Sequence, residues 1–177
     1  TFGAGISGAF DLGLNAGTGG AITGTTVAIN NLTITNGASA AFTDAVTVND
    51  LITTTATATT VSMTGSGNTF VADVDFLNTG LVTLGDATAD TFAFNDGLIF
   101  TGNAPSNVGA TITSGGVVNF GTGGVTLTDN STVATTQLLA TGRNIIFGAG
   151  ITDGASSFDL GLNAGTGGAI TGTTVAI

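Results

Sequence analysis

Large apolar residues alternate with small or polar ones over short stretches along the whole chain. Phe10, Leu12 and Leu14 alternate with Asp11 and Gly13, and this period of two predicts a strand. Glycine, asparagine and aspartate separate one such stretch from the next, roughly every ten residues, a spacing typical of all-β proteins. The pattern therefore predicts many short strands joined by tight turns.

We expect strands at 10–14, 22–29, 32–34, 41–48, 51–55, 61–63, 70–76, 81–84, 91–94, 98–100, 110–113, 117–120, 125–128, 138–140 and 145–147. The clearest alternation is FVADVDF at 70–76. Asp73 and Asp75 share one side of that predicted strand, and two like charges are tolerated there only in water. This side is expected to be exposed.

The sequence FDLGLNAGTGGAITGTTVAI occurs twice without a substitution, at 10–29 and at 158–177. The phrase FGAGI precedes each copy, at 2–6 and 147–151, but the spacers after it differ in length. We expect the longer spacer, with Ser156 and Ser157, to lie on the surface. The duplication defines a repeat unit of about 148 residues, 10–157.

A repeat of this kind favours a β-solenoid over a β-sandwich, because a closed sandwich has no neighbouring unit whose register must be kept. We predict that 1–177 is one continuous right-handed parallel β-solenoid of about six to eight rungs, each rung being one turn of roughly 20–24 residues. The alternative is a recent duplication inside an ordinary domain. The low complexity of the whole unit argues against it.

The expected core is formed by apolar residues on the inward sides of the predicted strands. Its members are Phe10, Leu12, Leu14, Phe70, Val74, Phe76, Phe92, Phe94, Phe120, Phe158, Leu160 and Leu162.

Composition narrows the functions open to this chain. Its net charge is −10 and Arg143 is its one basic side chain, which disfavours nucleic acid and anionic membranes as partners. No apolar run approaches the ~20 residues of a membrane-spanning helix, so membrane insertion of this segment is not expected. Histidine, cysteine, lysine, tyrosine and glutamate are absent. Most general bases and nucleophiles are therefore missing, and we expect no enzyme.

Three special sites were weighed against ordinary structural roles. Asp86 and Asp90 are the first candidates for a Ca²⁺ site, since calcium prefers carboxylate and carbonyl oxygens, although no established calcium motif is present. An acidic pair at Asp73 and Asp75 would need Arg143 nearby to resemble a polysaccharide lyase. Thr-x-Thr stretches at 33–35, 111–113 and 126–128 resemble ice-binding repeats but are sporadic, and β-propensity explains them.

The phrases NAGTGGAITG and VAINNLTITNGASAAFTDAVTVNDL resemble the giant bacterial β-strand-repeat surface proteins, the filamentous-haemagglutinin-like and adhesin-like chains. The resemblance implies an extracellular or cell-surface location and a structural role as a stiff rod, filament or coat. It implies no catalytic residues. The expected partner is the chain itself, by tandem continuation or end-to-end stacking. The alternative function is an adhesin module that holds a glycan, with or without Ca²⁺.

Overall fold

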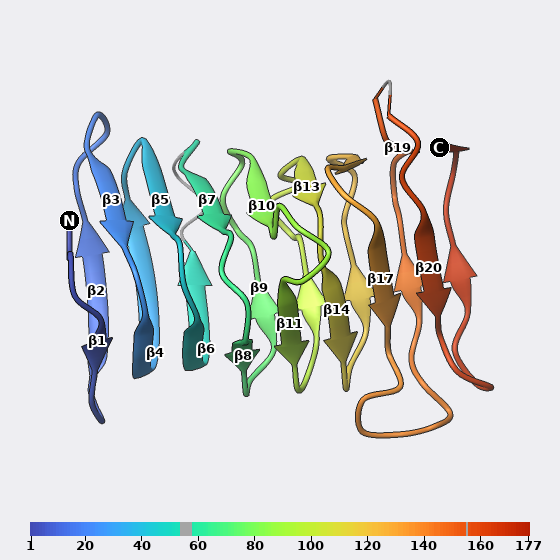
Figure 1. Ribbon diagram of the computed structural model, residues 1–177, viewed down its shortest axis with the longest axis horizontal. Helices are drawn as coiled ribbons and strands as arrows, with labels where there is room; N and C mark the ends of the chain where they lie inside the picture. The colour runs from blue at the N-terminus through green and yellow to red at the C-terminus, as the bar shows by residue number, and fades with distance from the viewer. Residues whose placement is uncertain (54–57, 155) are drawn as a thin grey trace.

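The computed structural model describes residues 1–53, 58–154 and 156–177, and these form an all-β parallel solenoid without a helix. The chain winds around one axis, and successive rungs follow one another from the N-terminus to the C-terminus (Figure 1). One of the two sheets contains 8 strands, one from each rung, and every strand pairing is parallel. The prediction of a parallel β-solenoid with six to eight rungs is confirmed.

Each rung contributes to three stacks of strands. The first stack contains β1 (Ile6–Ser7), the beginning of β4 (Val27–Asn36), the beginning of β6 (Val46–Thr53), β8 (Asn68–Phe70), β11 (Thr91–Phe94), β14 (Thr111–Ser114), β17 (Ser131–Ala134) and β20 (Leu160–Asn163). The second stack contains β2 (Asp11–Asn15), the ends of β4 and β6, β9 (Val74–Asp75), β12 (Leu98–Ile99), β15 (Val118–Asn119), β18 (Ile145–Ile146) and β21 (Ile170–Thr171).

The third stack is the separate sheet. It contains β3 (Ala21–Gly24), β5 (Ser39–Phe42), β7 (Thr60–Met63), β10 (Val82–Leu84), β13 (Ser106–Val108), β16 (Val125–Leu127), β19 (Ile151–Thr152) and β22 (Val175–Ala176).

Hydrogen-bonded register fixes the length of a rung. Val61 pairs with Val82 and Val82 with Ser106, which are steps of 21 and 24 residues. Between the first and second stacks the chain turns a corner. In β4, Ile29 and Leu32 are both buried with two residues between them, which breaks the period of two and requires a bend.

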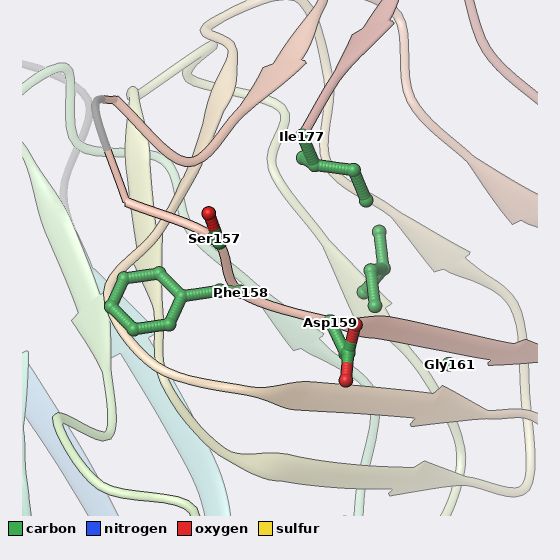
Figure 2. A pocket seen from close by; sticks show the side chains of 6 residues that line it. Ser157, Phe158, Asp159, Gly161 and Ile177 are labelled. Atoms are coloured by element: carbon green, nitrogen blue, oxygen red, sulfur yellow. The ribbon is translucent and has the colours of Figure 1, made fainter.

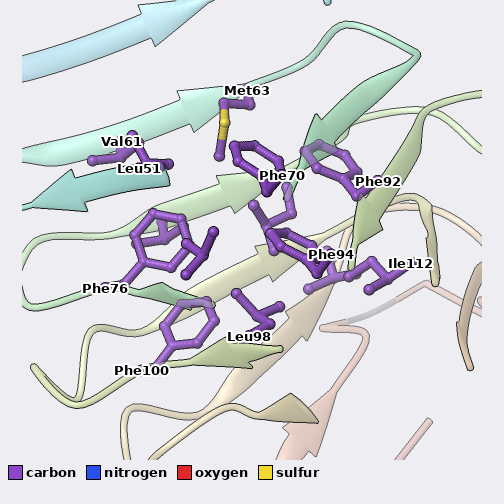
Figure 3. Packing of buried hydrophobic residues seen from close by; sticks show 14 of the residues in the cluster. Leu51, Val61, Met63, Phe70, Phe76, Phe92, Phe94, Leu98, Phe100 and Ile112 are labelled. Carbon is purple, nitrogen blue, oxygen red and sulfur yellow. The ribbon is translucent and has the colours of Figure 1, made fainter. Parts of the chain in front are cut away.

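Phenylalanine rings stack along the inside of the solenoid. Phe76, Phe100, Phe120 and Phe147 come from four successive rungs, with neighbouring ring centroids 4.9, 5.5 and 5.1 Å apart. Phe70 and Phe94 form a second stacked pair at 4.8 Å, and Figure 3 shows both groups packed among leucine and isoleucine side chains. Parallel pairing places like residues about 4.8 Å apart, so a repeated phenylalanine becomes a ladder of rings.

Most of the predicted core is confirmed. Phe70, Val74, Phe76, Phe92, Phe94 and Phe120 are buried, and Leu12, Leu14, Phe158, Leu160 and Leu162 are partly buried against the same cluster. Phe10 was predicted wrongly, because its side chain is 43 % exposed. It lies before β2 on the first rung, where no preceding rung covers it.

Two predicted strands differ from the structure. The stretch 138–140 lies in an exposed loop, with Leu138 63 % and Leu139 47 % exposed. The stretch 70–76 is divided into β8 and β9 by a corner at 71–73, and its alternation of burial continues through that corner. In the predicted strand 51–55, residues 54–55 lie outside the described residues, and 51–53 belong to β6.

Candidate functional site

The predicted calcium residues Asp86 and Asp90 lie in one turn between β10 and β11. Asp90 is buried, and its carboxylate Oδ2 accepts hydrogen bonds from the backbone N–H groups of Asp86 at 3.0 Å and Ala87 at 3.2 Å. The side chain of Asp86 is exposed. The carboxylate of Asp90 therefore holds the turn closed by accepting two backbone donors that would otherwise lack partners.

The structure brings Asp86 and Asp90 close together but adds no third acidic group to them. Among the described residues, no group of three or more acidic side chains could hold a metal ion. Calcium usually takes six to eight oxygen ligands. Calcium binding at this turn stays a prediction, whereas the hydrogen-bonding role of Asp90 is shown by the geometry.

Asp73 lies beside a shallow hollow on the outer surface. Asp73, Asp96, Ile99 and Val117 line this hollow of about 210 Å³. Partial burial raises the pKa of the Asp73 carboxyl, and the nearby charges of Asp96, Asp75 and Asp50 raise it further. Crowded carboxylates repel one another, and protonation relieves that repulsion.

The acidic pair that a lyase-like site would need is not assembled. Asp75 accepts hydrogen bonds from the Thr101 backbone N–H at 3.0 Å and hydroxyl at 2.8 Å. Arg143 lies three rungs further along, in the loop after β17, where its guanidinium donates to the Gly142 carbonyl. The structure therefore separates Arg143 from Asp73 and Asp75.

Other polar side chains join neighbouring rungs. Asp129 accepts hydrogen bonds from the Asn130 backbone N–H at 2.7 Å and from the backbone N–H and hydroxyl of Thr88 at 2.9 and 3.1 Å, and these bonds lower the pKa of Asp129. Buried Asn78 donates to the carbonyls of Thr59 and Gly80, both at 2.9 Å. These contacts stabilise turns between stacks, the role predicted for asparagine and threonine at repeated corners.

The Thr-x-Thr stretches do not form one surface. Thr33 lies on the second stack, Thr111 and Thr113 on the first, and Thr126 on the third. A flat ice-binding face needs such residues in one column. Ser156 and Ser157 are exposed as predicted, whereas Asp153, in the same spacer, is buried and accepts a hydrogen bond from the Phe158 backbone N–H.

The largest apolar opening lies at the last rung. Ser157, Phe158, Asp159, Leu160, Gly161 and Ile177 line an open hollow of about 610 Å³. Figure 2 shows Ile177 on one side of this hollow and the beginning of β20 on the other. The hollow exists because no rung covers the C-terminal side of these strands.

Comparison of the chain with models of protein families, with curated proteins and with solved structures found no match. In the part of the chain that the structure describes, no helix is long and apolar enough to cross a membrane.

Sequence reasoning missed the contact between Asp129 and Thr88. These residues are 41 positions apart and two rungs apart, so no local spacing connects them. The signal that could have found the open hollow was the duplication itself, since identical residues occupy two rungs with different neighbours.

Proposed function

We propose that this chain is a structural segment of an extracellular repeat protein, in which stacked rungs form a stiff rod, filament or surface coat. The observation that carries this proposal is the unbroken parallel pairing of the third stack, which has one strand in every rung. Each rung uses its neighbour as a template. The stack can therefore be extended without a change of architecture.

Two further features support a scaffold. Both end rungs present unpaired strand edges and partly exposed apolar residues, which is the arrangement expected where further rungs attach. The outer surface carries aspartate, asparagine and threonine with a single basic residue. This composition favours neither nucleic acid nor an anionic membrane as partner.

The extracellular location is inferred from the resemblance to bacterial surface repeats. A strongly acidic surface keeps such rods apart from one another in solution through mutual repulsion. A glycan-binding role is the rival proposal. It predicts sugar-specific binding that chelation of Ca²⁺ abolishes, whereas a pure scaffold shows neither effect.

The test is to join one, two and three 148-residue units and to measure the maximum dimension of each chain by small-angle X-ray scattering. A rod of constant width is expected to grow by about 30 Å per unit, because each unit adds nearly seven rungs at ~4.8 Å. Negative-stain microscopy of the three-unit chain should show one continuous rod. Separate globular units joined by flexible links would overturn the proposal.

A further inference from the structure

The two identical twenty-residue segments have opposite exposure. In the first copy, Ile22, Val27 and Ile29 are 6 %, 0 % and 7 % exposed. In the second copy, Ile170, Val175 and Ile177 are 49 %, 58 % and 52 % exposed. The first copy is covered by β4, β5 and β6, and the second has no rung beyond it. The same residues are therefore core in one place and surface in the other.

The two copies also lie on different stacks. In the first copy DLGLN is in the second stack, AITG in the third, and Val27–Ile29 in the first. In the second copy LGLN is in the first stack, Ile170 in the second, and Val175 in the third. Every strand of the second copy lies one stack earlier than its counterpart.

The local structure of the two copies is nevertheless the same. A Cβ atom on Gly24 would lie 2.7 Å from the ring of Phe2, and one on Gly172 would lie 3.9 Å from the ring of Phe147. Phe2 and Phe147 are themselves counterparts. The sequence thus closes its rung in the same way on either set of stacks, so the three stacks are interchangeable for it.

The repeat unit is consequently not a whole number of rungs. Ile6 lies in the first stack of the first rung, and its counterpart Ile151 lies in the third stack six rungs later. One unit therefore covers six rungs and two further stacks. A following unit begins a third of a turn short of the position where the preceding unit began.

We propose that the open last rung is completed by a second copy of the 148-residue unit, offset from the first by one stack. This inference rests on the proposed rod function and adds the geometry of the joint. The copy of Leu32–Ile34 would cover β20, the copy of β5 would cover β21, and the copy of Val46–Val48 would cover β22, as their originals cover β2, β3 and the beginning of β4.

Contacts in the first copy show that this occupant fits. Asn31 donates to the Asp11 carboxylate at 2.9 Å, and Asp159, the counterpart of Asp11, is exposed at the last rung. Phe42 packs against Gly24, with its ring 3.2 Å from a Cβ built there. Its copy would pack against Gly172 and continue the ladder of rings that ends at Phe147. The hollow beside Leu160 and Ile177 would be filled by the copy of Leu32.

The offset within one chain is tested by spin labels on introduced cysteines, since the chain has none. Thr23 and Ala176 are exposed and lie in one column of the third stack, so Thr23→Cys with Ala176→Cys reports a distance along the axis of about 34 Å. Thr23→Cys with Thr171→Cys joins counterparts on different stacks. It is expected to give a longer distance although Thr171 lies slightly nearer along the axis. An equal or shorter distance overturns the offset.

The joint is tested in a chain of residues 1–177 followed directly by residues 30–177. A cysteine replacing the second copy of Asn31 is combined either with Asp159→Cys, at the start of β20, or with Ala169→Cys, at the start of β21. Neighbouring strands bring Cα atoms within the ~4.4–6.8 Å that a disulfide requires. The proposal expects oxidation to join the pair with Asp159→Cys and not the pair with Ala169→Cys.

The outcomes separate this inference from the rod proposal. A disulfide with Ala169→Cys, or with neither position in a chain that still elongates by about 30 Å, overturns the one-stack offset and leaves the rod. A two-unit chain that does not elongate overturns the rod itself.

Discussion

At the residue scale, charge placement produces two aspartates with opposite pKa shifts. Partial burial and then the charges of Asp96, Asp75 and Asp50 raise the pKa of Asp73, and hydrogen bonds from Asn130 and Thr88 lower the pKa of Asp129. A raised pKa means that ionisation costs folded-state stability, and a lowered pKa means that ionisation adds to it.

Asp73→Asn is therefore expected to stabilise the protein at neutral pH. Its advantage over the parent should disappear as the pH falls below the ordinary carboxyl pKa of 3.8, where Asp73 is protonated in both the folded and unfolded states. The measurement is the free energy of urea unfolding as a function of pH.

Asp129→Asn is the matched control and should have the opposite sign. It is expected to destabilise the protein at neutral pH, with the loss fading as the pH drops through the lowered pKa of Asp129. Two variants with parallel pH profiles would contradict both assignments.

Asp90→Ala tests whether this residue closes a turn or binds calcium. Loss of the acceptor for the Asp86 and Ala87 N–H groups is expected to cost about 1–3 kcal/mol, equally in Ca²⁺ and in chelator. Asp86→Asn should have little effect in either condition. A calcium-dependent gain in melting temperature that both variants abolish would instead support the predicted Ca²⁺ site.

At the scale of the elements, the strands were predicted better than the corners. The period of two located the strand β11 at its observed bounds, and it placed β7, β10 and β16 to within one residue. The corner at 71–73 escaped because burial keeps alternating through it, so Phe70 and Val74 are both buried as in a straight strand. In β4, by contrast, Ile29 and Leu32 break the alternation, so that bend is visible in the sequence.

The apolar pair Leu138 and Leu139 shows a different limit. Hydrophobicity alone predicted a strand, but the pair lies in an extra excursion between β17 and β18. Val118 pairs with Ile145, 27 residues later, while other rungs are shorter. Only the register of neighbouring rungs reveals that this rung has residues to spare. Single-sequence alternation does not contain that information.

Close contact between rungs also limits substitution at particular corners. A Cβ atom on Gly116 would lie 1.4 Å from the carbonyl oxygen of Asp96 in the preceding rung. Gly116→Ala is expected to destabilise the chain by more than about 4 kcal/mol, because backbone atoms must separate. Gly13→Ala, where a Cβ meets nothing within 4 Å, should change stability by less than about 0.5 kcal/mol. Thermal unfolding of both variants checks the pair.

At the scale of the whole molecule, stability is distributed along the axis because each rung contacts mainly its two neighbours. Phe76 is fully buried and stacks on Phe100 with ring centroids 4.9 Å apart. Phe76→Ala is expected to cost about 3–5 kcal/mol locally. Hydrogen exchange should increase in β7 to β12 and remain unchanged in β17 to β19.

Val71→Ala is the control, since Val71 is 50 % exposed and its truncation should leave exchange near the parent's. A uniform increase in exchange along all rungs of the Phe76 variant would show that the chain unfolds as one cooperative unit.

The duplication predicted the architecture but not the joint between units. Identical sequence at 10–29 and 158–177 indicated continued stacking, and the structure confirms the stack. The displacement by one stack depends on the sum of all intervening turn lengths, including the excursion before Ile145. No single motif encodes that sum.

The excursion after β17 has a narrow neck. The hydroxyl of buried Thr135 donates to the carbonyl of Arg143 at 2.5 Å and accepts from its N–H at 3.0 Å. One side chain thus fastens both ends while Leu138 and Leu139 remain outside the stack. A guest peptide spliced between Leu139 and Ala140 would be carried as a passenger, and the strands on either side of the neck would keep their pairing.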